Sequence, residues 1–164
     1  MWRQSSCLLW AALCLTGCTG VQTKDSGVYR EGVTTPSGEP AYITVQHCLI
    51  GFEGSVHGKV IVRSQSEAEK LAQELFAKAQ AGEDFAAIVT AHTDDSPPGI
   101  YKMANDGFPG DMTSQVPSNY VYARSGMVPA FGNTGFPLEV GEVGLAVYDE
   151  NDSPFGWHIV KRIK

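Results

Sequence analysis

Two histidines in β-rich segments are the first side chains of this sequence that could do chemistry. His47 lies within 41–50, a run without strand breakers, and His158 lies within 155–163, the last β-rich run of the chain. If the first and last strands are neighbours in one sheet, the two imidazole rings could meet. A single histidine in a strand is more often structural, so a functional interpretation depends on what surrounds the pair.

Two further pairs of side chains lie between these histidines in the sequence. Asp94 and Asp95 occupy a loop directly after a predicted helix. Met127 and Phe131 are four residues apart on a short helix predicted over 127–133, so they are expected to share one face of that helix. Core packing is the commoner role of such an apolar pair, but the pair could equally form the wall of a pocket.

Spacing disfavours two other site classes that use these residue types. A glycosidase needs two carboxyl groups roughly 5–10 Å apart, and adjacent aspartates in one loop do not fix that separation. A zinc site would lack the closely spaced ligand pairs of known zinc motifs. Its candidate ligands would be His47, Cys48, His92 and His158. We therefore expect no metal site.

The elements that must position these side chains predict an α+β fold. Ser66 and Glu69 have the spacing of a capping box that opens a helix, and Gly82 is a typical residue to end it. A second short helix is predicted over 84–92. Two strands are predicted near the end of the chain, over 142–148 and 155–163. Because strands lie at both ends with helices between them, we expect the terminal strands to share one antiparallel sheet.

The order of these segments resembles the parvulin-type peptidyl-prolyl cis–trans isomerases, over nearly all of 43–164. The matching segments are His47-Cys-Leu-Ile50, the helix 67–79, Ala81-Gly-Glu-Asp-Phe85, Ala91-His-Thr-Asp-Asp-Ser96, Gly126-Met-Val-Pro-Ala-Phe131, Phe136-Pro-Leu-Glu-Val-Gly-Glu-Val143 and Phe155-Gly-Trp-His-Ile-Val160. The resemblance implies a four-stranded antiparallel sheet surrounded by short helices. It also implies peptidyl-prolyl isomerase activity without a cofactor.

The resemblance assigns polar roles at four positions. His47 and His158 match the paired histidines that hold the hydrogen-bond network of the family's active site. Asp95 matches a position that is Cys or Asp in the family. Ser153 lies where a Thr or Ser hydroxyl often joins the histidines. All four would be catalytic, with Asp95 either opposing charge at the substrate carbonyl or orienting His47.

The same resemblance places the apolar pocket for the proline ring at Met127 and Phe131. Rotation about the amide bond is opposed by about 18–20 kcal/mol because the C–N bond has double-bond character. An apolar grip on the ring, together with a polar network at the twisting carbonyl, would favour the twisted geometry over either planar one.

The sequence departs from the family pattern at two places. Family members that bind phosphate before the proline carry basic residues in the loop after the first strand. This loop has Gly51 four residues after His47, then Glu53, and no lysine or arginine before Lys59. A preference for phosphorylated substrates is therefore not expected. The family's Gly-Asp-Leu-Gly segment has two rival matches, Gly99-Ile-Tyr101 and Gly110-Asp-Met112.

The N-terminus resembles a bacterial lipoprotein signal. Residues 1–17 contain Arg3 and then a short apolar run, too short for a transmembrane helix, which needs about 20 residues. Leu15-Thr16-Gly17-Cys18 resembles the lipobox, in which the cysteine thiol receives the lipid. We expect a flexible tether over 18–40, which is rich in Thr, Ser, Gly and Pro, and an isomerase domain over 41–164. Cys48 would be the one cysteine left unmodified.

These features predict an envelope protein anchored to a bacterial membrane by lipid and facing the periplasm. The formal charge of −6 argues against nucleic acid as a partner. The expected partners are proline-containing unfolded or exported polypeptides. An alternative is a parvulin-like chaperone or binding module with little turnover, which would hold extended polypeptides in the same groove.

Overall fold

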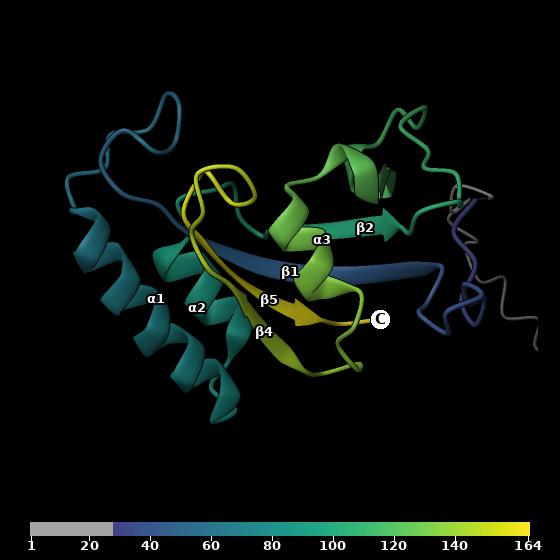
Figure 1. Cartoon of the computed structure of the whole chain (residues 1–164), viewed down its shortest axis with the longest axis horizontal. Coiled ribbons are helices and arrows are strands. Elements are labelled where there is room, and N and C mark those ends of the chain that lie inside the picture. Colours follow the sequence, from purple (N-terminus) through teal and green to yellow (C-terminus); the bar gives the residue numbers. More distant parts are fainter. Residues whose placement is uncertain (1–27) are drawn as a thin grey trace, which may run out of the picture.

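A five-stranded sheet forms the centre of the computed structural model, which describes residues 28–164 (Figure 1). The strands lie in the order β3-β2-β1-β5-β4. Their bounds are Tyr42–Ile50 for β1, Ile100–Ala104 for β2, Val121–Ala123 for β3, Val143–Ala146 for β4 and Trp157–Arg162 for β5. The predicted signal peptide 1–17 and lipidation site Cys18 lie outside the described residues.

The expected pairing of the terminal strands is confirmed, since β1 and β5 are antiparallel neighbours at the centre of the sheet. The α+β class is also confirmed. The sheet differs from the four-stranded antiparallel one expected, because β3 is added as a fifth strand that runs parallel to β2. The sequence pattern predicted neither β2 nor β3, which are five and three residues long and follow loops rich in Gly and Pro.

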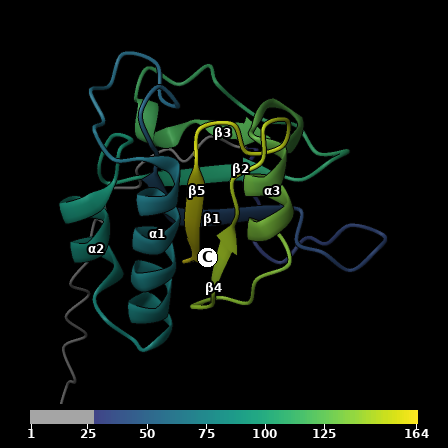
Figure 2. The same cartoon turned by 60° about the vertical axis from the view of Figure 1, so that its left-hand side comes forward.

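Helices cover both faces of this sheet. Helices α1 (Gln65–Gln80) and α2 (Phe85–His92) lie on one side, and α3 (Pro129–Gly135) lies on the other. Figure 2 shows the sheet between them. Two short 3₁₀ turns, at Pro117–Asn119 and Arg124–Gly126, flank β3. None of the helices within 28–164 has the length and hydropathy that a membrane span requires.

The capping box of α1 lies two residues before the predicted one. Ser64 is the N-cap, and its side chain accepts a hydrogen bond from the backbone N–H of Glu67, while the Glu67 carboxylate accepts from the Ser64 N–H (2.7 Å). The predicted pair Ser66 and Glu69 has the same spacing, so spacing alone did not distinguish the two. Ser64 takes the position because its backbone is extended, as an N-cap requires.

Alternation along β1 sends its side chains into core clusters on the two faces of the sheet. Ile43 and Val45 pack with Phe131 and Phe136 on the α3 face. Cys48 packs on the opposite face, in the cluster formed with α1 and α2. Burial raises the pKa of the Cys48 thiol to about 12, so this cysteine behaves as a small apolar core residue. Because successive side chains of a strand point to opposite faces, His47 lies on the α3 face, as Ile43 and Val45 do.

The segment 28–40 packs against the sheet, so the predicted flexible tether is wrong for this part of 18–40. Thr44 Oγ1 donates a hydrogen bond to the hydroxyl of Tyr29 (3.1 Å), and the Tyr29 ring lies 5.5 Å from the ring of Tyr42. The Ala41 N–H donates to the Val33 carbonyl (2.7 Å). Composition did not predict this because the partners of the segment lie on β1.

Arg124 joins this N-terminal segment to the other side of the sheet. Its guanidinium contacts the Glu39 carboxylate (3.2 Å) and donates to Asn105 Oδ1 and Asn133 Oδ1 (2.8 Å each). It also lies over the ring of Phe136, 4.8 Å from the centroid. One side chain therefore connects the N-terminal segment, the end of β2 and helix α3.

Candidate active site

The two histidine rings meet at the centre of the sheet. In the β1–β5 register His158 lies opposite Leu49, and His47 lies opposite Val160. The histidines are therefore diagonal neighbours on one face. Their rings stack at a centroid distance of 5.5 Å with an interplanar angle of 15°, and their Nδ1 atoms are 3.4 Å apart.

Asp95 completes a line of polar contacts through His47. One carboxylate oxygen of Asp95 lies 3.0 Å from His47 Nε2 and accepts a hydrogen bond from the Tyr101 hydroxyl (2.8 Å). The hydrogen bond with His47 holds the pKa of the Asp95 carboxyl well below its usual range, the bond from Tyr101 adds to this, and partial burial opposes it. Burial, and then Asp95, raise the pKa of the Tyr101 hydroxyl above its usual value.

The Asp95 carboxylate assigns one proton of the histidine pair. Because Asp95 is ionised, His47 Nε2 carries a hydrogen and donates it. The other ring nitrogen, His47 Nδ1, faces His158 Nδ1 at 3.4 Å. Burial, and then the neighbouring His47, lower the pKa of His158 to about 3, so His158 is neutral. Its Nε2 is buried without a hydrogen-bond partner among the residues that the structure describes.

A cavity of about 250 Å³ opens beside this network. Its polar wall is formed by His47, Asp95, Tyr101 and His158, and its apolar wall by Leu49, Val56, Met127, Val128, Phe131 and Phe155. The Phe131 ring packs edge-on against His47 (5.1 Å between centroids) and lies 5.6 Å from the His158 ring. The histidines, Asp95, Met127 and Phe131 predicted from the sequence therefore line one cavity.

Met127 reaches the cavity from outside the helix, so the predicted shared helix face with Phe131 is wrong. Helix α3 begins at Pro129, and Val128 is its N-cap with non-helical backbone (φ −57°, ψ 125°). Proline disfavours helical backbone in the residue before it and is well suited to the first helical position. The Pro129 ring thus sets the start of the helix two residues after Met127.

Ser153 does not join the histidine network as expected. The hydroxyl is fully buried and donates to the Gly156 carbonyl (2.7 Å). The backbone of Ser153 pairs with Asp149 across the turn between β4 and β5. A serine hydroxyl could bond either to the histidines or to the backbone of its own turn. Here the hydroxyl bonds within the turn, which makes Ser153 a structural residue.

Tyr101 is the polar residue of the cavity that sequence reasoning missed. The sequence signal for Tyr101 was the segment Gly99-Ile-Tyr101, one of the two rival matches to the family's Gly-Asp-Leu-Gly segment. Strand β2 brings this segment to the site. In the other match, Gly110-Asp-Met112, Asp111 forms a β-bridge with Val121. Gly99 has a φ of +64°, and a Cβ there would lie 2.4 Å from the His47 carbonyl oxygen. The His47 N–H donates to the Gly99 carbonyl (2.9 Å). Glycine is required for this close approach.

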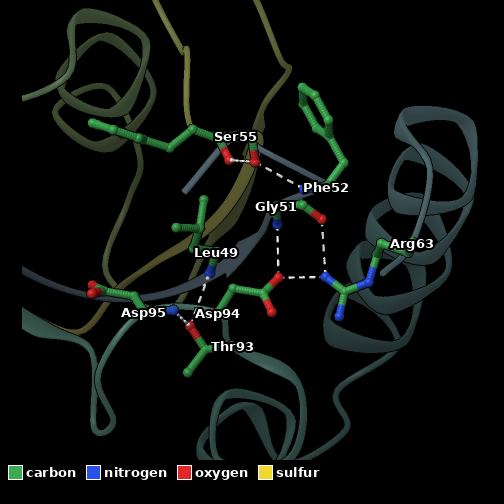
Figure 3. A network of polar contacts seen from close by, with 9 residues as sticks. Leu49, Gly51, Phe52, Ser55, Arg63, Thr93, Asp94 and Asp95 are labelled. Carbon is green, nitrogen blue, oxygen red and sulfur yellow. Dashed lines mark hydrogen bonds and ion pairs between the residues drawn. The ribbon is translucent and has the colours of Figure 1, made fainter. Parts of the chain in front are cut away.

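A second layer of hydrogen bonds holds the Asp95 loop against β1 (Figure 3). Thr93 Oγ1 accepts from the backbone N–H groups of Leu49 (3.1 Å) and Asp95 (3.2 Å). Asp94 accepts from the Gly51 N–H (2.8 Å) and pairs with Arg63. In Figure 3 the Asp95 side chain points away from this pair. The two adjacent aspartates therefore have different partners, and Asp95 alone lines the cavity.

Known proteins share both the sequence pattern and this fold. Residues 33–163 match the model of the PPIC-type PPIase domain. The chain is 34% identical over 101 residues to chaperone SurA of Hahella chejuensis (strain KCTC 2396), covering 61% of this chain and 19% of that protein. Peptidyl-prolyl isomerase ESS1 from Candida albicans has a similar fold (TM-score 0.55, 20% identity, 80% of this chain and 66% of that one).

TbPIN1 is similar in fold as well, with a TM-score of 0.50 and 16% identity over 76% of this chain and 98% of that one. The chain spans about a fifth of the length of the SurA relative. The family match covers most of the chain and includes every residue of the cavity. The protein therefore belongs to the PPIC-type peptidyl-prolyl isomerase family, the parvulins.

Proposed function

We propose that this chain catalyses cis–trans isomerisation of peptidyl-prolyl bonds in unfolded or exported polypeptides. The observation that carries the proposal is the division of one cavity into an apolar wall around Phe131 and a polar wall of His47, Asp95 and Tyr101. A proline ring fits the chemistry of the first wall, and the carbonyl before it fits the second. The SurA relative is named a chaperone, which supports unfolded polypeptides as substrates.

The proposed mechanism needs no bond to the substrate. Amide resonance puts negative charge on the carbonyl oxygen and double-bond character in the C–N bond, which resists rotation by about 18–20 kcal/mol. The ionised Asp95, 32% exposed at the cavity, disfavours that charge-separated form and so lowers the barrier. His47 fixes the orientation of the carboxylate, and the apolar wall holds the ring while the carbonyl turns.

The decisive measurement is a protease-coupled assay with an Ala-Pro peptide. We expect the full-length chain to accelerate isomerisation in proportion to its concentration. A chaperone or binding module with little turnover is the second candidate function, because the SurA relative is named a chaperone. Binding of an unfolded polypeptide without any acceleration would establish that alternative and reject the proposed enzyme.

Phosphorylated substrates are expected to be poorer than unphosphorylated ones. Among the described residues that line the cavity there is neither lysine nor arginine. Arg63, in the segment after β1, is paired with Asp94, and the Asp95 carboxylate would repel a phosphate. We therefore expect kcat/KM for a phosphoserine-proline peptide to be below that for the matched serine-proline peptide. A higher value for the phosphorylated peptide would contradict the proposal.

We further propose that lipid on Cys18 anchors the protein to the bacterial envelope. The support is the sequence Leu15-Thr16-Gly17-Cys18 after a short apolar run. Cells expressing the wild type should incorporate labelled palmitate into the chain, and Cys18→Ser should remove the label. Cys14→Ser is the matched control, because Cys14 lies in the same segment and should leave labelling intact. Labelling that survives Cys18→Ser would reject the anchor.

A further inference from the structure

Four aromatic rings form a continuous row that leads away from the active-site cavity. The row, here called the aromatic ladder, consists of Phe131, Tyr101, Tyr122 and Tyr120. Successive ring centroids are 6.0 Å, 5.4 Å and 6.2 Å apart. The first two rings line the cavity, whereas the last two lie beyond it. The proposed catalytic site accounts for Phe131 and Tyr101 but gives no role to the outer two.

The strand register places the ladder on the α3 face of the sheet. Tyr101 and Met103 are two residues apart on β2, and Met103 pairs with Tyr122 of β3. Residues two apart or directly paired share a face, so Tyr122 lies on the same side as Tyr101. Tyr120, two residues before Tyr122, continues the row. Figure 2 shows β3 beside β2 at the end of the sheet away from β4.

The outer rings have accessible surface. Tyr120 and Tyr122 are half-buried, and within the described part of the chain neither belongs to a buried core cluster. Their ring contacts are with each other and with Tyr101. Strand β3 buries Val121, while Tyr122 and the preceding Tyr120 present a row of aromatic surface continuous with the cavity.

We propose that the aromatic ladder is a subsite for an aromatic side chain located two residues from the proline in the same polypeptide. The inference rests on the proposed isomerase function and names a class of preferred substrate. Side chains two residues apart in an extended peptide are about 6.6–6.8 Å apart, close to one step of the ladder. A proline ring held at Phe131 and Tyr101 thus places its second neighbour against Tyr122, where rings pack edge-on or offset.

Three peptides test this subsite with the full-length chain. The reference has alanine at both positions two residues from the proline, and the others have phenylalanine two residues before or two residues after it. We expect one phenylalanine peptide to have a kcat/KM about 3- to 10-fold above the reference, through a lower KM. Tyr122→Thr, which keeps a strand-forming residue but removes the ring, should abolish that ratio.

Two further comparisons separate the possible failures. Tyr122→Phe keeps the ring and should retain the preference, and Val140→Ala changes a remote exposed residue and should retain it as well. Activity on the reference without a phenylalanine preference, or a preference that survives Tyr122→Thr, would overturn the subsite alone. If no peptide is isomerised, the proposed function fails. Peptide affinity measured by calorimetry on the same variants then tests the ladder by the same ratios.

Discussion

Replacing His158 by leucine is expected to lower kcat/KM about 100-fold while leaving the free energy of unfolding within about 1 kcal/mol of the wild type. The two effects differ because His158 is costly to bury. The ring is 4% exposed, its Nε2 has no partner among the described residues, and burial lowers its pKa to about 3. Leucine removes an unsatisfied nitrogen from an apolar site, which offsets the lost contact with His47.

The loss of activity follows from what His158 does for its neighbour. Its Nδ1 is the partner of His47 Nδ1, and the two rings are stacked. Without that partner His47 can rotate away from Asp95 Oδ2, which it contacts at 3.0 Å. A small misalignment of a polar network can cost about 100-fold in rate. We therefore expect the effect mainly in kcat, with KM for the peptide changed less.

Ile159→Val is the matched control for His158→Leu. Ile159 is the next residue on β5 and faces the α1–α2 side, in the cluster that contains Cys48. The substitution should lower the free energy of unfolding by about 1 kcal/mol without a comparable loss of activity. Urea unfolding and the protease-coupled assay, applied to both variants, give the comparison. Retention of activity within 3-fold in His158→Leu would contradict the role given to this histidine.

The meeting of His47 with His158 could be predicted because it depends on regular features. Side chains alternate along a strand, and the terminal strands of the chain are neighbours. Asp95 and Phe131 could be predicted only through the family pattern. No local rule places a loop carboxylate 48 residues away against a strand histidine.

Features that depend on competing local solutions could not be predicted. Two serine–glutamate pairs had capping-box spacing, and the backbone at Ser64 decided between them. Ser153 has the residue type of a network member, but its hydroxyl bonds within its own turn. Strand β3 is three residues long, too short for a detectable period of two, and only its pairing with β2 defines it. Tyr101 reaches the site because Gly99, two residues before it, passes close to the His47 carbonyl oxygen. A Cβ at this position would clash with that oxygen.

The second large effect is expected for Asp95→Asn, which should lower kcat about 10- to 100-fold with KM nearly constant. Asparagine keeps an oxygen that can accept from His47 Nε2 and from the Tyr101 hydroxyl, so it preserves much of the geometry but removes the charge. A charge that opposes carbonyl polarisation acts on the rotating amide. A large loss in kcat would therefore identify an electrostatic role, and a loss below 3-fold would mean that Asp95 only orients His47.

Tyr101→Phe and Asp106→Asn complete the comparison. Tyr101→Phe removes one hydrogen bond to the carboxylate but leaves its charge, so it should cost less activity than Asp95→Asn. Asp106 is exposed, and its replacement by asparagine changes the net charge equally without touching the cavity. It should leave kcat unchanged. Equal losses in Asp95→Asn and Asp106→Asn would indicate a general charge effect and contradict the local one.

The pH dependence of the same variants follows from the lowered pKa of Asp95. A carboxyl whose pKa is lower in the folded state than in the unfolded state stabilises the fold at pH values above the unfolded-state pKa of about 3.9. This stabilisation is lost as the pH falls toward the folded-state pKa. Asp95 is therefore ionised throughout pH 5–8. The difference in free energy of unfolding between wild type and Asp95→Asn should shrink as the pH falls below about 4. A difference that stays the same from pH 5 down to pH 2 would contradict the lowered pKa of Asp95.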